Sequence, residues 1–194
     1  MKMTMGIDFG AKKSGFTVAC FGPNPGMLNV KQSEKGKDAD HFLFNLIKLH
    51  QPQIIAIDAP LSIPHGILGM GKNYSHRACD GQLNAMSPMF LGGLTARAIA
   101  LKDSIINEFT NVQVIETYPK GLVHEILGQP FIKTYKKEIE EFLANLKKHY
   151  NFNLDIMINN WHQVDGLLAF ISASRHLDGR SDVYGDPAEG LIYL

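Results

Sequence analysis

Apolar and polar stretches at the start of the chain predict three antiparallel strands followed by a helix. The strands are expected at 3–9, 16–21 and 27–32. Turns rich in glycine and proline separate them, as is typical of hairpins. Residues 38–50 carry apolar side chains three and four positions apart, the spacing of one helical face, and Pro52 ends this predicted helix.

The next apolar run, 54–58, is unbroken, so its periodicity does not separate a strand from a helix. Its length, its β-branched residues and the prolines on either side favour a buried strand that ends at Asp58. Residues 61–86 are irregular, apart from a helix expected within 74–83. Beyond them the pattern predicts helices at 87–105, 119–127, 134–150 and 161–177, and a strand at 111–116.

This order of elements predicts an α/β fold. Hairpin strands followed by strands that alternate with helices are typical of a mixed sheet covered by helices. We expect one domain over residues 1–194, with a mainly helical insert at about 61–110.

Composition and charge narrow the class of protein. Hydrophobic residues make up 45% and charged residues 20% of the 194 positions, the usage of a soluble globular domain. Nineteen Lys and Arg balance nineteen Asp and Glu, so a site for a polyanion has to be a local patch. Two cysteines are too few for a disulfide framework, and no apolar run approaches the roughly 18 residues of a membrane span. We therefore expect a cytoplasmic protein with no membrane partner.

Acidic residues stand at the ends of the predicted strands. Asp8, Asp58 and Glu116 each follow an apolar run. A buried carboxylate is costly unless a cation or hydrogen-bond donors replace its water. If the strands that end in Asp8 and Asp58 are neighbours, these side chains meet in the crevice where open α/β sheets bind ligands. Asp165 and His162 are three residues apart on the last predicted helix, so both can face that crevice.

Such a cluster of carboxylates suits hard divalent cations. Mg²⁺ and Mn²⁺ prefer oxygen ligands, and two ions about 3.5–4 Å apart can activate a water and stabilise the leaving oxygen of a phosphodiester. We expect the carboxylates of Asp8, Asp58, Glu116 and Asp165 to converge on such ions. The alternative for Glu116 is a cap on the helix that follows it.

Six motifs carry a family resemblance over nearly the whole chain. They are Gly-Ile-Asp-Phe-Gly at 6–10, Ile-Ala-Ile-Asp-Ala-Pro at 55–60, Arg-Ala-Cys-Asp at 77–80, Glu-Thr-Tyr-Pro at 116–119, Asp-Gly-Leu-Leu-Ala at 165–169 and Gly-Asp-Pro-Ala-Glu-Gly-Leu-Ile-Tyr at 185–193. They resemble an uncharacterised family of predicted nucleases with the ribonuclease H fold.

The resemblance implies a five-stranded mixed sheet in the order 3-2-1-4-5, with strand 2 antiparallel, flanked by helices. The wider superfamily, which includes RuvC-type junction resolvases, implies a two-metal site on Asp8, Asp58 and Asp165. Those enzymes carry carboxylates at both i and i+3 on the last helix, whereas the first of these positions is His162 here. An imidazole binds Mn²⁺ or acts as a base, so His162 changes the expected ligand set.

Basic residues near the expected site are Lys12, Lys13 and Arg77, which we expect to contact substrate phosphates. The alternative is scattered, solvated charge. Lys136 and Lys137, interleaved with glutamates, are interpreted as the solvated face of an ordinary helix.

The leading hypothesis is a metal-dependent nuclease that uses Mg²⁺ or Mn²⁺ and acts on DNA or RNA. In this hypothesis Asp8, Asp58 and Asp165 bind the metal, and Glu116 or His162 orients the water. One alternative is a catalytically inactive module that binds nucleic acid or protein. Another is a small nucleotide hydrolase or phosphotransferase. The sequence is compatible with a homodimer and does not fix the oligomeric state.

Overall fold

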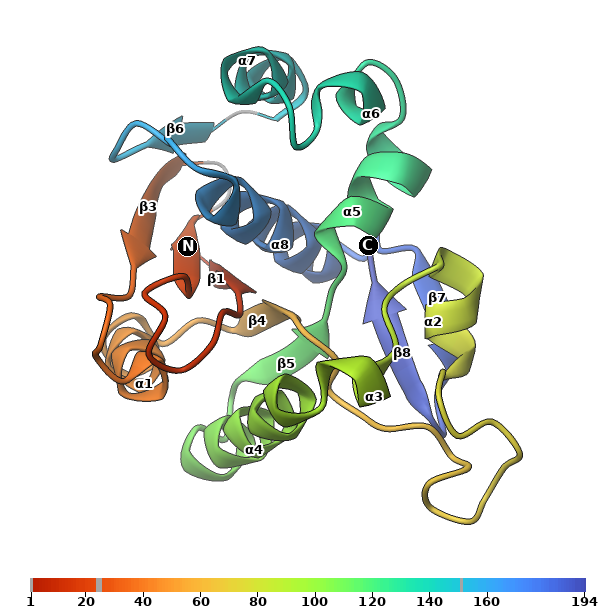
Figure 1. The fold of residues 1–194 in the computed structure, drawn as a ribbon. Coiled ribbons are helices and arrows are strands. Elements are labelled where there is room, and N and C mark those ends of the chain that lie inside the picture. The colour runs from red at the N-terminus through yellow and green to blue at the C-terminus, as the bar shows by residue number, and fades with distance from the viewer. Residues whose placement is uncertain (1, 24–25, 151) are drawn as a thin grey trace.

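The structure is a computed structural model that describes residues 2–23, 26–150 and 152–194. The strands in these ranges are β1 (Met3–Asp8), β2 (Val18–Pro23), β3 (Gly26–Gln32), β4 (Ile54–Asp58), β5 (Gln113–Glu116), β6 (Phe152–Leu154), β7 (Val183–Asp186) and β8 (Gly190–Tyr193). They form one mixed, open sheet in the order β6-β3-β2-β1-β4-β5-β8-β7 (Figure 1). The predicted α/β class is confirmed.

Helices cover both faces of the sheet (Figure 1). In chain order they are α1 (Ala39–His50), α2 (Ala78–Leu83), α3 (Pro88–Leu91), α4 (Gly93–Glu108), α5 (Pro119–Gly121), the π-helix η1 (Leu122–Leu127), α6 (Phe131–Thr134), α7 (Ile139–His149) and α8 (Trp161–Leu177). On one face, α8 lies against β1, β2 and β4. On the other face, α1 and α4 bury their apolar sides against β1 and β4.

Alternation along β1 decides which side chains meet α8. Met5 and Ile7 are fully buried in the cluster shared with α1 and α4. Gly6 faces α8 so closely that a Cβ on it would lie 1.9 Å from the backbone nitrogen of Phe170. Because side chains in a strand alternate with a period of two, Asp8 points to the same face as Gly6, toward α8.

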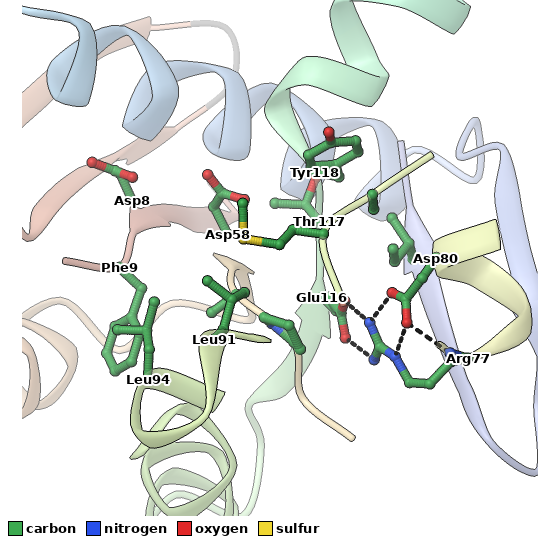
Figure 2. A pocket seen from close by; sticks show the side chains of 15 residues that line it. Asp8, Phe9, Asp58, Arg77, Asp80, Leu91, Leu94, Glu116, Thr117 and Tyr118 are labelled. Carbon is green, nitrogen blue, oxygen red and sulfur yellow. Dashed lines mark hydrogen bonds and ion pairs between the residues drawn. The ribbon is translucent and has the colours of Figure 1, made fainter. Parts of the chain in front are cut away.

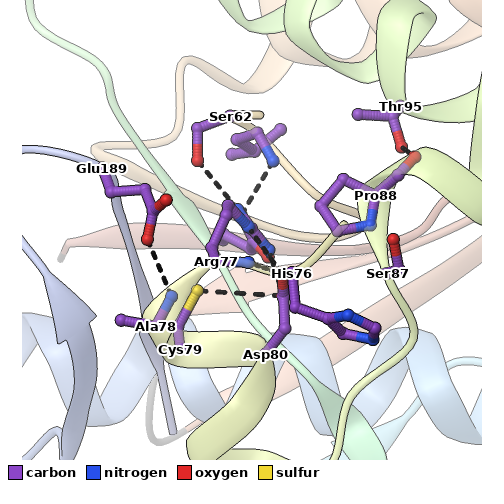
Figure 3. Close-up of polar contacts among 12 residues, drawn as sticks. Ser62, His76, Arg77, Ala78, Cys79, Asp80, Ser87, Pro88, Thr95 and Glu189 are labelled. Atoms are coloured by element: carbon purple, nitrogen blue, oxygen red, sulfur yellow. Dashed lines mark hydrogen bonds and ion pairs between the residues drawn. The ribbon is translucent and has the colours of Figure 1, made fainter. Parts of the chain in front are cut away.

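The expected count of five strands is wrong, since the sheet has eight strands within the described residues. The strands β3, β2, β1, β4 and β5 are adjacent in that order, with β2 antiparallel to β1, and the other three extend the two edges. Each of these three has only three or four residues, too few for a periodic pattern. Glu189, between β7 and β8, accepts hydrogen bonds from the backbone N–H groups of His65 and Ala78. Figure 3 shows the bond from Ala78, and the two bonds together connect this hairpin to the segment after β4.

Two predicted helices are interrupted. The helix expected at 87–105 is divided into α3 and α4 at Gly92, whose φ is 49°. The helix expected at 134–150 begins only at Ile139, after a loop in which Lys136 has a φ of 60°. A left-handed residue cannot continue a right-handed helix. The apolar spacing persists across both interruptions, so the sequence pattern did not show them.

Smaller differences concern the ends of elements. The strands expected at 16–21 and 111–116 begin at Val18 and Gln113, the helix expected within 74–83 begins at Ala78, and the helix expected at 119–127 becomes a π-helix at Leu122. Between β4 and β5 the chain forms α2, α3 and α4 and the loops that join them. None of the helices in the described residues has the length and apolar character needed to cross a bilayer.

Candidate functional site

Asp8 and Asp58 lie side by side at the carboxyl ends of neighbouring strands. β1 and β4 are parallel, and their register places Asp8 directly opposite Asp58. In β4, as in β1, the residue two positions before the aspartate faces α8. In β4 this residue is Ala56, which packs with Ala173 of that helix. Because side chains alternate along a strand, both carboxylates lie on the α8 side of the sheet. Figure 2 shows that the two side chains point in the same direction.

Asp165 is brought to these strands by the first turns of α8. Asn160 caps this helix, because its side chain accepts the N–H of Gln163. Asp165 is buried, with 6% of its surface exposed. One carboxylate oxygen accepts a hydrogen bond from the Tyr135 hydroxyl at 2.8 Å, and the other accepts one from the Lys136 ammonium.

His162 partners Asp8. Its Nδ1 lies 2.8 Å from Oδ2 of Asp8, and its ring stacks on Phe16 with 4.9 Å between the centroids. The hydrogen bond to Asp8 raises the pKa of His162, and partial burial opposes that shift. The expected convergence of His162 on this crevice is thus present in the structure, with Asp8 as its partner.

Lys136 belongs to the site, although its sequence pattern predicts a solvated position. It was expected on the solvated face of a helix, but it stands in the loop between α6 and α7. Its ammonium pairs with Asp165 and lies 5.2 Å from the centroid of the Tyr135 ring and 5.6 Å from that of Trp161. Charge patterning gave no signal for this position, because the loop follows from an interruption of the helix.

The electrostatics of the site show an excess of negative charge. Burial raises the pKa of Asp58 well above its ordinary value, and the charges of Asp8 and Asp165 raise it further, while Lys136 lowers it. Burial also raises the pKa of Asp165, although Lys136 and Tyr135 oppose this. Three carboxylates here face one ammonium and the imidazole of His162, an arrangement that additional positive charge would stabilise.

The donor set fits a hard divalent cation in its chemistry. Carboxylate oxygens from three separate elements are the ligands that Mg²⁺ and Mn²⁺ prefer. Lys136, whose side chain is 47% exposed, supplies the cation that contacts Asp165 in this structure. Within the ranges that the structure describes, no group of three or more His, Cys, Asp or Glu side chains is already gathered around one ion position.

Glu116 and Arg77 do not take the expected roles, because they bind each other (Figure 2). Glu116 is 5% exposed, and its two oxygens accept bonds of 2.6 and 2.7 Å from the Arg77 guanidinium. The backbone N–H of Leu61 also donates to Glu116, at 2.7 Å. These bonds leave Glu116 poorly placed to orient a water and contradict that expectation.

Arg77 is 1% exposed, which contradicts the expected contact with substrate phosphates. Besides Glu116, it bonds Asp80 through Nε and Nη2, and Ser62 through Nη1 (Figure 3). The two carboxylates raise the pKa of Arg77 against the opposing effect of burial. A spacing of three residues between Arg77 and Asp80 at the start of a helix was the available sequence signal for this pairing.

Lys12 and Lys13 are exposed in the loop that directly follows Asp8 and Phe9. Lys12 pairs with Asp38 at 3.2 Å and with Asp40 at 3.5 Å. Ion pairs this exposed are weak, so they leave Lys12 available for another anion. The predicted phosphate contacts of both lysines are compatible with their positions.

A cavity of about 250 Å³ opens beside Asp8 and Asp58. Its other walls include the apolar side chains of Phe9, Leu91 and Leu94, which Figure 2 shows on the side of the strand ends away from Tyr118. No sequence pattern predicts this cavity, since α3 and α4 form its wall only because the chain turns at Gly92.

Comparison with known proteins adds no family assignment. A scan against protein-family models finds no match, and a search of curated proteins finds no matching sequence. The fold and the site define the chain as an α/β protein with a carboxylate site at the carboxyl ends of its central strands.

Proposed function

We propose that this chain is a cytoplasmic, metal-dependent nuclease that hydrolyses phosphodiester bonds of DNA or RNA with Mg²⁺ or Mn²⁺. One observation carries the proposal: Asp8 and Asp58 are paired in register at the ends of parallel strands, and α8 adds Asp165 on the same face. Two buried free cysteines, Cys20 and Cys79, support a reducing compartment.

We also propose that the domain is ribonuclease H-like. The adjacent order β3-β2-β1-β4-β5, with β2 antiparallel, supports this assignment. On this view β6, β7 and β8 are additions at the edges, and α2 to α4 form an insert between the fourth and fifth strands.

The residues of the chain have distinct roles in this proposal. Asp8, Asp58 and Asp165 hold the metal. When bound, a divalent ion lowers the pKa of a water and stabilises charge on the phosphate oxygens. His162 fixes the orientation of the Asp8 carboxylate through its hydrogen bond. Lys12 and Lys13 provide positive charge for the phosphates that flank the cleaved bond.

Cleavage of labelled single-stranded, duplex and branched nucleic acids with Mn²⁺ tests the proposal. We expect Asp8→Asn and Asp58→Asn to lower the rate at least about 100-fold, because each removes a charged metal ligand. The matched control is Asp103→Asn, a side chain that is 61% exposed on α4. Equal cleavage rates for Asp8→Asn and wild type would contradict the proposal.

A second candidate, a non-catalytic binding module, is favoured by the contacts of Asp165. Both of its oxygens already have partners, Tyr135 and Lys136, so the site is partly satisfied without an ion. Calorimetry with Mn²⁺ separates the two functions. A nuclease has a Mn²⁺ site that disappears in Asp8→Asn and Asp58→Asn, whereas a binding module has none.

A further inference from the structure

The cavity beside the carboxylates has walls of two kinds. Asp8 and Asp58 line one side, and most of the remaining wall is apolar, with Phe9, Met86, Leu91 and Leu94 among its residues. Met86 is 60% exposed, so it stands where the cavity meets solvent. A concave, mainly apolar cavity with a few polar groups is the usual form of a site for a small organic group.

The end of the cavity that contains Arg77 offers no free charge. All five N–H donors of the guanidinium are used: three go to Asp80 and Ser62, and two go to Glu116. The negative charges of these two carboxylates face the positive charge of Arg77 directly. A phosphate or carboxylate group of a ligand therefore has no free cation to bind there, and the part of the ligand that enters carries no negative charge.

Thr117 gives independent evidence for a ligand. It lines the cavity and is 2% exposed, and its hydroxyl has no hydrogen-bond partner within the described residues. A buried hydroxyl without a partner carries an uncompensated desolvation cost, and rotation about χ1 would turn it toward a polar edge of a ligand in the cavity, which removes that cost. The cavity thus suits an uncharged, largely apolar group that has hydrogen-bonding atoms on its edge.

We propose that this cavity receives one nucleobase of the substrate strand. A nucleobase is flat and uncharged, has two apolar faces and carries donors and acceptors on its edge. The inference rests on the proposed function, because it places the adjoining phosphate at Asp8 and Asp58. A cavity of about 250 Å³ holds a single base, and sites for whole drug-sized ligands are commonly about 300–1,000 Å³. The substrate is therefore unpaired at this position.

The surface next to the cavity fits the same substrate. Phe90, which precedes Leu91 on α3, is 81% exposed. Exposed aromatic rings stack on successive bases of single strands without a sequence preference. An unpaired strand that inserts one base beside Leu91 passes close to this ring.

Nuclear magnetic resonance titrations test the inference without any cleavage reaction. The probes are thymidine, which carries no charge, and deoxyribose, which lacks the base. We expect saturable shifts at the amides of Met86, Leu91 and Thr117 with thymidine and none with deoxyribose. Met86→Ala and Thr117→Val weaken thymidine binding at least about threefold, as expected for the loss of one wall contact or one hydrogen bond.

Met89→Ala is the matched control, because Met89 is also exposed, at 44%, but does not line the cavity. It leaves the affinity for thymidine unchanged. Thr117→Val keeps the shape of the buried side chain and Met86→Ala changes an exposed one, so folding does not confound both results. Absence of saturable shifts, equal shifts with deoxyribose, or wild-type affinity in both cavity variants overturns the inference.

Two further titrations, with hexathymidylate and with thymidine 5′-triphosphate in the presence of Ca²⁺, identify the source of the base. Tighter binding of hexathymidylate supports a nucleic-acid strand, and tighter binding of the triphosphate overturns that part of the inference. Thymidine binding without Mn²⁺-dependent cleavage contradicts the nuclease alone. Cleavage without thymidine binding contradicts the base site alone.

Discussion

Asp58 shows how burial and neighbouring charges act on one side chain. It ends a buried strand opposite Asp8, and no hydrogen bond to its carboxylate is found among the described residues. Burial and the charges of Asp8 and Asp165 raise its pKa. Ionised Asp58 therefore lowers the stability of the fold unless a cation is near, and this links the chemistry of the site to folding.

We expect Asp58→Asn to raise the melting temperature near neutral pH in buffer with EDTA. A carboxyl group whose pKa is raised by folding stabilises the protein fully below its unfolded pKa, about 3.9, and loses that contribution as the pH rises through the folded pKa. Asparagine stays neutral at every pH, so the variant is expected to be more stable than wild type at neutral pH. Each kcal/mol of added stability raises the melting temperature by about 2–4 °C, and this difference disappears as the pH falls to about 4. Thermal unfolding from about pH 8 to pH 4 measures it.

The control for this experiment is Asp103→Asn, which changes a carboxylate that is 61% exposed. Its melting temperature is expected to follow wild type at every pH. If Asp58→Asn melted below wild type at neutral pH in EDTA, the ionised carboxylate would be stabilising the fold, against this prediction.

Arg77 holds the other buried charges of the cavity together. It pairs with Glu116 and Asp80, and all three side chains are at most 5% exposed. We expect Arg77→Met to lower the free energy of unfolding by about 3–5 kcal/mol, because it leaves two buried carboxylates without their cation. Urea unfolding measures this change.

Two variants test the cause of that loss. Adding Glu116→Gln and Asp80→Asn to Arg77→Met is expected to restore part of the stability, since it removes the unpaired charges. Arg180→Met breaks an exposed pair with Asp178 and is expected to change stability by less than about 0.5 kcal/mol. A loss of under about 1 kcal/mol in Arg77→Met would contradict the role assigned to the buried pair.

At the scale of elements, two interruptions of helices build the site. The turn at Gly92 lets α3 and α4 line the cavity, and the loop around Lys136 brings its ammonium to Asp165. Lys136 has a left-handed φ of 60°, which costs energy in a residue with a Cβ. Strained backbone of this kind is often found at functional sites, and here it coincides with the candidate site.

The close packing of α8 on β1 depends on Gly6. We expect Gly6→Ala to lower the free energy of unfolding by about 3 kcal/mol or more, because its Cβ would lie 1.9 Å from the backbone nitrogen of Phe170. Chemical denaturation measures the change. The shift of α8 also displaces Asp165, so Mn²⁺ affinity is expected to fall with stability.

Gly81→Ala is the matched control for Gly6→Ala. It lies within α2, and a Cβ there would have no atom within 4 Å. Alanine favours helix over glycine, so this variant is expected to gain up to about 1 kcal/mol. Similar effects of the two substitutions would show that helix packing against β1 is looser than the structure indicates.

For the whole molecule, the balance of charge limits how strongly the proposed nucleic-acid substrate would be attracted. With nineteen basic and nineteen acidic residues, the attraction to nucleic acid that the proposed function requires comes from local charges, namely Lys12 and Lys13. Two such contacts predict a slope of about −1.4 for the logarithm of the binding constant of a single strand against the logarithm of salt concentration.

Fluorescence anisotropy at constant Ca²⁺ and increasing KCl measures this slope. Lys12→Ala with Lys13→Ala is expected to reduce its magnitude by about 1.4, since each lost phosphate contact contributes about 0.7. The control is the double substitution Lys147→Ala and Lys148→Ala in the last turn of α7. It is expected to leave the slope unchanged. A wild-type slope steeper than about −4 would require a larger basic surface than the site provides.

Much of the fold was accessible from the sequence because its signals are local. The apolar runs of β1 and β4, the helical spacing of α1 and the cap at Asn160 each lie within one element. The edge strands β6 to β8 were missed because three or four residues carry no periodic pattern. β6 and β8 pair with distant segments, and β7 pairs with β8 in a hairpin. Placement of Asp8, Asp58 and Asp165 near one another followed from strand ends and helix position.

The sequence by itself determined the α/β class, the central strands and the acidic residues at their ends, because apolar periodicity and chain order govern those features. Only the tertiary structure decided which charges meet. It paired Glu116 with Arg77 and Asp165 with Lys136, although each pair is separated by nearly 30 residues or more along the chain. The physical reason is that such pairings depend on where helices end and strands align in space, and local side-chain patterns do not encode those positions.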